Sequence, residues 1–133
     1  MVNKLVGVGF GGIYLAVGLL GFFVTGFSDL TSMDGGLLLG IFMLNPLHNI
    51  VHVLVGAVLI AGGLASDTIS KRVNTTVGGV YLLVFAMGLA VQGSTANILA
   101  LNWADDGLHL VSALLLAGVG LGADRTTTRA AFR

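Results

Sequence analysis

Four long apolar stretches constrain the fold of this chain more than any other feature of its sequence. Each comes close to the roughly 20 residues that an α-helix needs to cross a hydrocarbon core about 30 Å thick. They cover residues 5–27, 46–65, 77–91 and 103–123, and the third is the shortest. The connectors between them are rich in the Ser, Thr, Asp, Asn and Gly that favour turns. The pattern predicts an all-α integral membrane protein, a four-transmembrane-helix bundle forming one domain over residues 1–133.

The composition excludes several classes of protein. Hydrophobic residues make up 56% of the chain and charged residues 9%, and the mean hydropathy is +0.99. Soluble domains carry roughly 25% charged residues. The formal net charge is zero, which argues against a nucleic-acid partner, since such proteins need a basic face. The absence of cysteine excludes disulfides, cysteine-ligated zinc, iron–sulfur clusters and covalently attached haem c.

The positively charged residues predict how the spans are oriented. They precede the first span, separate the second from the third, or follow the fourth: Lys4, Lys71, Arg72, Arg125, Arg129 and Arg133. Because cytoplasmic loops carry an excess of Lys and Arg, we expect both termini, with a tail at 124–133, in the cytoplasm. The connectors 28–45 and 92–102 then face outward.

The apolar segment 35–44 is too short to cross a membrane. It either lies along the outer interface or extends the second helix with a kink at Pro46. Asn is a preferred N-cap and Pro suits the first position of a helix. We therefore favour a second helix that begins at Pro46 and is capped by Asn45. Asn102 stands in the same place before the fourth span.

The second half of the sequence repeats the first. LNPLHNIVH, from Leu44, aligns without a gap with LNWADDGLH, from Leu101, and GGIYL in the first span matches GGVYL in the third. We therefore predict two tandem two-helix repeats, over residues 5–65 and 77–123. An even number of spans in each repeat gives both copies one orientation, with a pseudo-twofold axis along the membrane normal. Equivalent residues of spans two and four then face a shared axis.

Each repeat carries a polar stripe in an otherwise apolar span. Its members follow the i, i+3, i+4, i+7 spacing of one helix face: Asn45, His48, Asn49 and His52 in the first copy, and Asn102, Asp105, Asp106 and His109 in the second. Ionisable groups in a membrane helix turn inward and find partners. The two stripes predict a polar cluster between spans two and four, toward the outward side.

The two stripes contain a candidate set of ligands for a divalent transition-metal ion. Ligands four residues apart on a helix can bind one ion, as in the HExxH motif. Three imidazoles and one carboxylate form a four-ligand set for zinc or a similar ion: His48, His52, Asp105 and His109. The other polar side chains would orient the ring N–H groups: Asn45, Asn49, Asn102 and Asp106.

Two other interpretations stay open. His52 and His109, at equivalent positions, would suit the axial ligands of haem b, with Gly56 giving clearance to the porphyrin and Ala113 in the equivalent place. Alternatively, the stripes form an interhelical hydrogen-bond network in a structural or accessory subunit of a larger membrane complex. GxxxG pairs such as Gly7 and Gly11 fit close helix packing or a homodimer.

Transport and catalysis have less support. Beyond His52 and His109, spans two and four contain one polar side chain, that of Ser112, so no polar path continues to the cytoplasm. The sequence contains no recognisable nucleophile–base pair or phosphate-binding loop. We therefore expect a protein that is not an enzyme.

The paired motifs resemble a bacterial family of four-span membrane proteins, domain of unknown function 4383. The resemblance rests on N-x-x-H-N-x-x-H from Asn45, N-x-x-D-x-x-x-H from Asn102, and the GGIYL and GGVYL segments, and it covers nearly the whole chain. The family commonly has Asp-Asn where this chain has Asp105 and Asp106. The resemblance implies a small multi-pass protein of the plasma (inner) membrane, and it supplies no activity, cofactor or catalytic residue.

Overall fold

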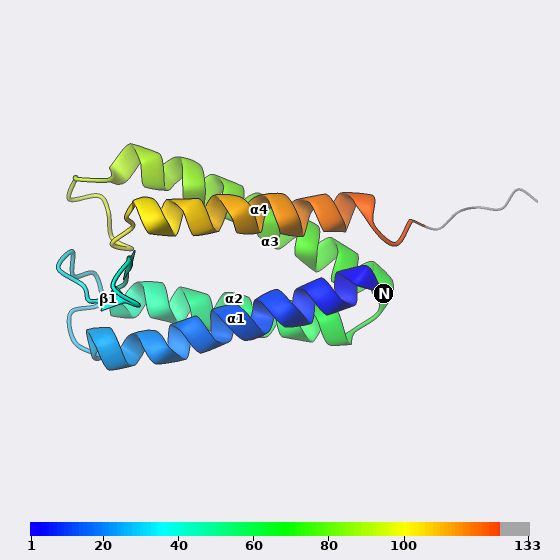
Figure 1. The fold of residues 1–133 in the computed structure, drawn as a ribbon, viewed down its shortest axis with the longest axis horizontal. Coiled ribbons are helices and arrows are strands. Elements are labelled where there is room, and N and C mark those ends of the chain that lie inside the picture. The colour runs from blue at the N-terminus through cyan, green and yellow to red at the C-terminus, as the bar shows by residue number, and fades with distance from the viewer. Residues whose placement is uncertain (126–133) are drawn as a thin grey trace, which may run out of the picture.

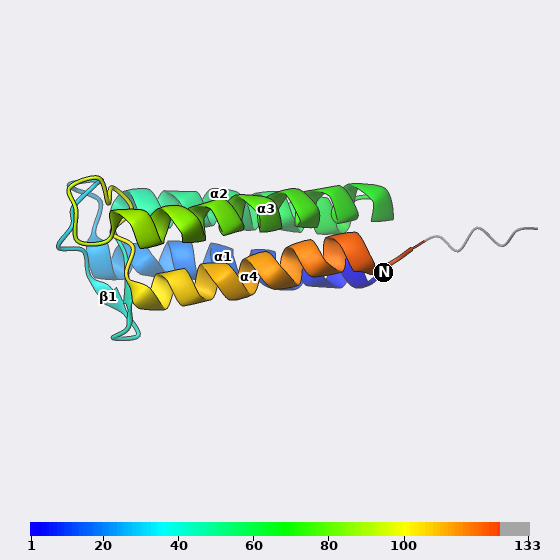
Figure 2. The same ribbon diagram turned by 90° about the horizontal axis from the view of Figure 1, so that it is seen from above.

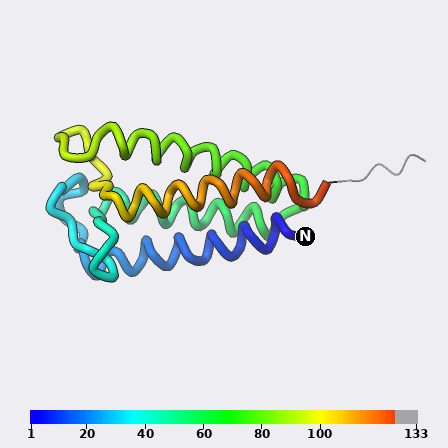
Figure 3. The backbone as a smooth tube through the Cα atoms, turned by 45° about the horizontal axis from the view of Figure 1, so that its top comes forward, coloured from blue at the N-terminus to red at the C-terminus, as the bar shows by residue number. Residues whose placement is uncertain are grey.

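Four long helices run side by side in the computed structural model, which describes residues 1–125 (Figures 1 and 2). All four are long and apolar enough to cross a membrane: α1 (Val2–Thr25), α2 (Pro46–Leu64), α3 (Asp67–Val91) and α4 (Trp103–Gly122). The α1–α2 and α3–α4 connectors meet at one end, here called the connector end (Figure 3). The start of α1 and the end of α4 lie at the other, the terminal end. The predicted four-helix architecture is confirmed, and residues 126–133 of the predicted tail lie outside the described residues.

α3 begins at Asp67, well before its predicted start at residue 77. The polar residues 67–76 indicated a loop, yet they form the first turns of the helix. Ser66 caps it by accepting a hydrogen bond from the Ile69 N–H (3.3 Å). The helix then gives its polar side chains partners on other elements: Ser70 Oγ donates to Gly62 O (2.8 Å) and Asn74 Nδ2 to Asn3 O (2.8 Å). These distant acceptors are invisible in the local sequence.

The segment before α2 forms a short hairpin and does not extend the helix. β1 (Leu37–Leu38) pairs antiparallel with β2 (Phe42–Met43). Leu39 and Gly40 turn the chain with positive φ angles of 55° and 74°. The predicted start of α2 is confirmed, because Asn45 caps the helix and Pro46 is its first residue.

The helices pack as two close pairs, α1 with α2 and α3 with α4. In the first pair two glycines face each other. A Cβ atom on Gly11 would lie 2.8 Å from Gly56 O, and one on Gly56 would lie 2.7 Å from Gly11 O. In the second pair a Cβ on Gly78 would lie 2.5 Å from Ala117 N. The core between the pairs contains Tyr14, Leu59, Val77, Tyr81, Ala113 and Leu116.

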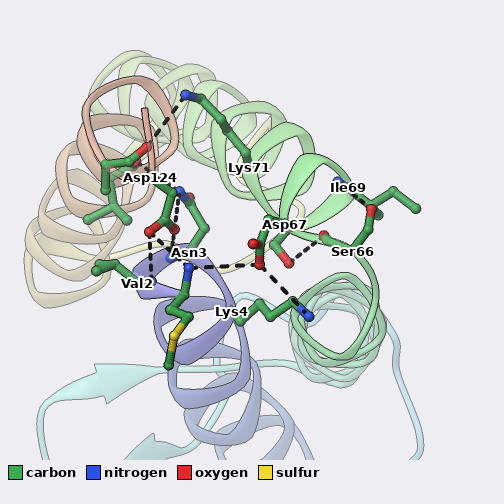
Figure 4. Close-up of polar contacts among 12 residues, drawn as sticks. Val2, Asn3, Lys4, Ser66, Asp67, Ile69, Lys71 and Asp124 are labelled. Carbon is green, nitrogen blue, oxygen red and sulfur yellow. Dashed lines mark hydrogen bonds and ion pairs between the residues drawn. The ribbon is translucent and has the colours of Figure 1, made fainter. Parts of the chain in front are cut away.

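A polar network joins the start of α1 to the end of α4 at the terminal end (Figure 4). The Asp124 carboxylate accepts hydrogen bonds from the Val2 N–H (3.1 Å), the Asn3 N–H (2.8 Å) and Asn3 Nδ2 (3.2 Å). Donation by the Asn3 backbone, above all, holds the pKa of Asp124 below its ordinary range, because these bonds favour the ionised carboxylate. Beside it, Lys4 forms an ion pair with Asp67 (3.8 Å).

The lowered pKa of Asp124 predicts a stability that depends on pH. Its pKa in the unfolded chain is about 3.9, so the folded state gains stability above that pH and loses it as the pH falls toward the lower folded-state pKa. Between pH 5 and pH 3, the Tm of the wild type should therefore fall more than that of Asp124→Asn. Thermal unfolding in detergent measures both. Equal pH profiles would contradict the prediction.

Candidate metal centre

The helix caps at the connector end place both polar stripes at the same level of the bundle. Asn45 Oδ1 accepts a hydrogen bond from the His48 N–H (2.8 Å). Asn102 and Asp105 form a reciprocal capping box, in which each side chain accepts from the other's backbone N–H (3.0 Å each). A capping box satisfies two otherwise free N–H groups of the first turn. The predicted starts of α2 and α4 thus bring the two stripes face to face.

Three histidines meet between α2 and α4. His48, His52 and His109 are each 1% exposed, and each offers a ring nitrogen that lies within 4.8 Å of the other two. The ring centroids of His48 and His52 are 4.3 Å apart, and that of His109 lies 5.8 Å from the first and 6.1 Å from the second. The predicted convergence of these three ligands is therefore seen in the structure.

The histidine rings are buried without ordinary hydrogen bonds. Within the described chain, neither ring nitrogen of His48 or His52 has a partner, and neither does Nδ1 of His109. A neutral imidazole always carries one N–H donor. A buried polar group left unsatisfied costs roughly 1–3 kcal/mol. Three such rings in one cluster therefore favour a bound group that uses their nitrogens.

Two tyrosines form the floor of the histidine cluster. The Tyr81 ring stacks on His109 at 5.2 Å, the Tyr14 ring meets His52 edge-on at 5.1 Å, and the two tyrosine rings stack at 5.0 Å. The Tyr14 hydroxyl and Ser112 Oγ share a hydrogen bond of 2.5 Å. Neither tyrosine belongs to the polar stripes from which the site was predicted. Their equivalent positions in GGIYL and GGVYL were the signal that could have placed them there.

Asp105, the fourth predicted ligand, faces a competing role. Its Oδ2 accepts the Asn102 N–H in the capping box. It is not among the residues whose ligand atoms gather within 4.8 Å of one another. The structure thus brings three of the four predicted ligands together, and the carboxylate of the fourth, Asp105, caps α4.

The residues expected to orient the imidazoles bond elsewhere. Asn45 Nδ2 donates to Ile98 O (2.8 Å) and Asn49 Nδ2 to Thr25 Oγ1 (2.8 Å). On α4, Asn102 Nδ2 donates to Ile41 O (2.8 Å), and Asp106 accepts from Gln92 Nε2. In the described residues, none of these four side chains hydrogen-bonds a histidine ring. Each ties the start of a helix to a neighbouring helix or connector.

Matching contacts recur in the two helix pairs. Asn49 bonds Thr25 on α1, and a Cβ on Gly21 of that helix would collide with the Asn49 side chain. In the second pair, Asp106 bonds Gln92 of α3's C-cap, and a Cβ on Gly88 would collide with the Asp106 carboxylate. Each glycine therefore makes room for a buried polar side chain of the partner helix.

Gly56 does not have the role expected for it in a haem site. Its Cβ position lies 2.6 Å from Leu15 N and 2.7 Å from Gly11 O. The space beside this glycine therefore belongs to the backbone of α1. The glycine permits the close approach of α1 and α2 and gives no clearance to a porphyrin.

The two connectors cover the histidine cluster at the connector end. Leu44, Ala100 and Leu101, which lie just before α2 and α4, are 0%, 1% and 3% exposed. Each capping asparagine also binds the opposite connector, since Asn45 donates to Ile98 O and Asn102 to Ile41 O. We call these two side-chain bonds the cross-connector latch. These two bonds hold the two connectors together at the end of the bundle that contains the histidine rings.

Opening the latch should loosen both connectors. Asn102→Asp keeps the oxygen that caps α4 but loses the Nδ2 donor to Ile41 O. One hydrogen bond contributes about 0.5–1.5 kcal/mol, so local amide exchange in segments 36–44 and 97–101 should accelerate by roughly 2- to 10-fold. Hydrogen exchange read by mass spectrometry measures it. Asn97→Asp is the matched control, because in the described residues the Asn97 side chain bonds only Leu101, within its own connector. Equal acceleration of segment 36–44 in the control would contradict a latch between connectors.

Comparison with known protein families gives a match over most of the chain. The model of a protein family described as Domain of unknown function (DUF4383) matches residues 4–122 of the 133-residue chain. No curated protein and no solved structure matches the chain. The matched region contains all three histidines and both capping asparagines.

Proposed function

The chain belongs to the family of Domain of unknown function DUF4383, and we propose that this member is a multi-pass membrane protein whose buried histidines bind a divalent transition-metal ion. One observation carries the proposal. The nitrogens of His48, His52 and His109 converge within 4.8 Å, and five of their six ring nitrogens are buried without a hydrogen bond in the described chain. A metal ion would use three of these nitrogens at once.

The ligand set suits a borderline ion such as zinc. Tetrahedral zinc with Zn–N bonds of about 2.0–2.1 Å has ligand nitrogens roughly 3.4 Å apart. The ring nitrogens, which lie within 4.8 Å of one another, therefore need to approach one another by up to about 1.4 Å around an ion, which side-chain rotations can provide. Three histidine ligands leave a fourth position, and Asp105 is the proposed protein ligand for it. Neutral imidazoles also suit copper and nickel.

The packing favours an ion over haem b. A porphyrin held by His52 and His109 would need a flat space between their rings, yet the His48 ring lies 4.3 Å from one and 5.8 Å from the other. The Tyr14 ring also packs against His52, and the Tyr81 ring packs against His109. An ion needs no such space.

A structural or accessory subunit is the second candidate function. It is favoured by the bonds from Asn49 to Thr25 and from Asp106 to Gln92, which tie helices together without any ligand. Such bonds contribute about 0.6 kcal/mol each in membrane helices. The histidine rings make no comparable bonds, so this alternative explains the amides better than the imidazoles. A binding role also suits the buried cluster better than catalysis, because each of the three histidines is 1% exposed.

We further propose that both termini are cytoplasmic, in the plasma (inner) membrane. The described basic residues gather at the terminal end: Lys4, Lys71, Arg72 and Arg125. An excess of Lys and Arg is typical of cytoplasmic ends. The recurrent glycine–polar contacts of the two helix pairs support the proposed duplication, in which Asn49 corresponds to Asp106 and Gly21 to Gly88. The histidine cluster would then lie toward the outward side.

Elemental analysis and an optical spectrum of detergent-purified protein test the binding proposal. The wild type should retain close to one equivalent of metal, and added Co²⁺ should give the absorption of a tetrahedral nitrogen site. His52→Ala/His109→Ala should lose the metal, whereas Asn49→Ala, a buried polar change on the same helix, should keep it. A Soret band would identify haem instead. Absence of metal and haem in the wild type, even after both are supplied, would overturn the proposal.

A further inference from the structure

A groove runs along the lipid-facing side of α3 from the terminal end toward the middle of the bundle. Three adjoining cavities form it, with volumes of about 360, 180 and 170 Å³. The first and second share Arg72 and Thr76 as lining residues, and the second and third share Val58 and Val77. The first cavity lies against α4, because Gly120 and Leu121 also line it, and the other two lie against α2. The groove therefore passes over the exposed Arg72 and Thr76 from one flank of α3 to the other.

The groove changes character along its length. At the terminal end it is lined by polar and basic side chains of α3 and by Gly120 and Leu121 of α4, the α3 residues being Thr68, Lys71, Arg72, Thr75 and Thr76. Farther along it is lined by apolar side chains of α2 and α3 alone: Leu54, Val55, Val58, Val77 and Val80. From Arg72 to Val80 the helix rises about 12 Å, close to the roughly 15 Å that one leaflet contributes to a 30 Å hydrocarbon core. The apolar part is therefore long enough for much of one acyl chain.

The basic side chains at the mouth of the groove lack acidic partners. In the described part of the chain, neither Lys71 nor Arg72 forms an ion pair. The two acidic residues of this end are engaged on the α1 side, Asp67 with Lys4 and Asp124 with the Val2 and Asn3 N–H groups (Figure 4). Lys71 Nζ lies 3.5 Å from Ala123 O, which holds it beside the mouth. The groove thus offers two positive charges at the depth where lipid headgroups lie.

We propose that this groove binds one anionic phospholipid, with its phosphate at Lys71 and Arg72 and one acyl chain along Val58 and Val77. Basic pockets between membrane helices recognise anionic headgroups. The apolar channel below the charges distinguishes this site from a general attraction to an anionic surface. The inference is independent of metal binding, because the groove lies on the outer side of α3, beside α4 and then α2, and none of the three histidines lines it.

Native mass spectrometry of the full chain in detergent tests the site with phosphatidylglycerol and phosphatidylcholine of identical acyl chains. One phosphatidylglycerol should be retained in preference to phosphatidylcholine. Each basic residue near an anionic surface changes binding about fivefold, so Lys71→Gln/Arg72→Gln should weaken phosphatidylglycerol binding roughly 25-fold. Lys4→Gln, which removes a basic residue of the same end outside the groove, should leave the binding unchanged. Inorganic phosphate should not displace the lipid.

A second pair of variants tests the acyl-chain channel. Val58→Phe should fill the channel and lower phosphatidylglycerol binding, whereas Val111→Phe, the same change at an exposed position of α4, should not. Equal binding of the two lipids to the wild type would overturn the proposal, as would unchanged binding in the Lys71→Gln/Arg72→Gln variant. An equal loss of phosphatidylglycerol binding in Lys4→Gln would contradict a specific site, because it would show only a general electrostatic attraction between the basic end and anionic lipid. Unchanged phosphatidylglycerol binding in Val58→Phe would show that the acyl chain does not lie in the groove.

Discussion

Zinc should raise the Tm of the wild-type protein and leave that of His109→Leu unchanged. An ion that binds only the folded state stabilises it by about 2.7 kcal/mol at one hundred times its Kd. His109 is the one candidate histidine from α4, so its loss leaves two ligands on α2 alone. Leucine fills a similar volume and removes the buried Nδ1 that has no partner. Thermal unfolding in detergent, with zinc and with a chelator, gives the comparison.

The ion-free measurement separates the metal site from a structural network. If the histidine rings serve as metal ligands, the free energy of unfolding of metal-free His109→Leu should stay within about 1.5 kcal/mol of the wild-type value. The reason is that an apolar residue of similar volume is tolerated in the core. If His109 instead belongs to an interhelical hydrogen-bond network, the same change should strongly lower the stability of the metal-free protein. An equal response of both proteins to zinc would place the ion elsewhere in the molecule.

Gly56→Ala should destabilise the bundle by about 1–3 kcal/mol, the usual cost of overpacking a close contact. The added methyl group would lie 2.6 Å from Leu15 N and 2.7 Å from Gly11 O, so the backbones of α1 and α2 would have to separate. Backbone cannot rotate away as a long side chain can. Unfolding of the purified protein in detergent, by heat or denaturant, measures the loss.

Gly12→Ala is the matched control for this change. It lies on α1 close to the same contact, but its Cβ position has no atom within 4 Å. Alanine also favours a helix by up to about 1 kcal/mol over glycine, so Gly12→Ala should be neutral or stabilising. Equal destabilisation by both changes would show that helix conformation, and not the α1–α2 approach, accounts for the effect.

Local signals in the sequence predicted the elements of this protein well where the cause itself is local. The length and hydrophobicity of the spans predicted four helices, and the Asn-Pro pair predicted the start of α2 at Pro46, with Asn45 as its cap. The start of α3 was predicted wrongly, because residues 67–76 are polar and their stabilising partners lie elsewhere. Asn74 finds its acceptor on Asn3, 71 positions away in sequence.

The candidate site was predictable in part for the same reason. Spacing on a single helix places His48 and His52 on one face, and the repeated motif places His109 at the corresponding level of α4. Spacing could not decide which group each polar side chain would bind. The Asp105 carboxylate can either cap a helix or bind a metal ion, and in the structure its Oδ2 caps the helix.

The sequence by itself determined the number of long apolar helices, the starts of α2 and α4 after their caps Asn45 and Asn102, and the inward face on which the polar residues lie. These depend on length, period and first-turn chemistry, all of which act over a few residues. Only the tertiary structure decided that three histidines would converge without hydrogen bonds, and that the capping amides would cross to opposite connectors. It also gave the space beside Gly56 to the backbone of α1. A buried polar group takes its partner from whatever the fold brings within hydrogen-bonding distance, and that choice is made between residues far apart in the chain.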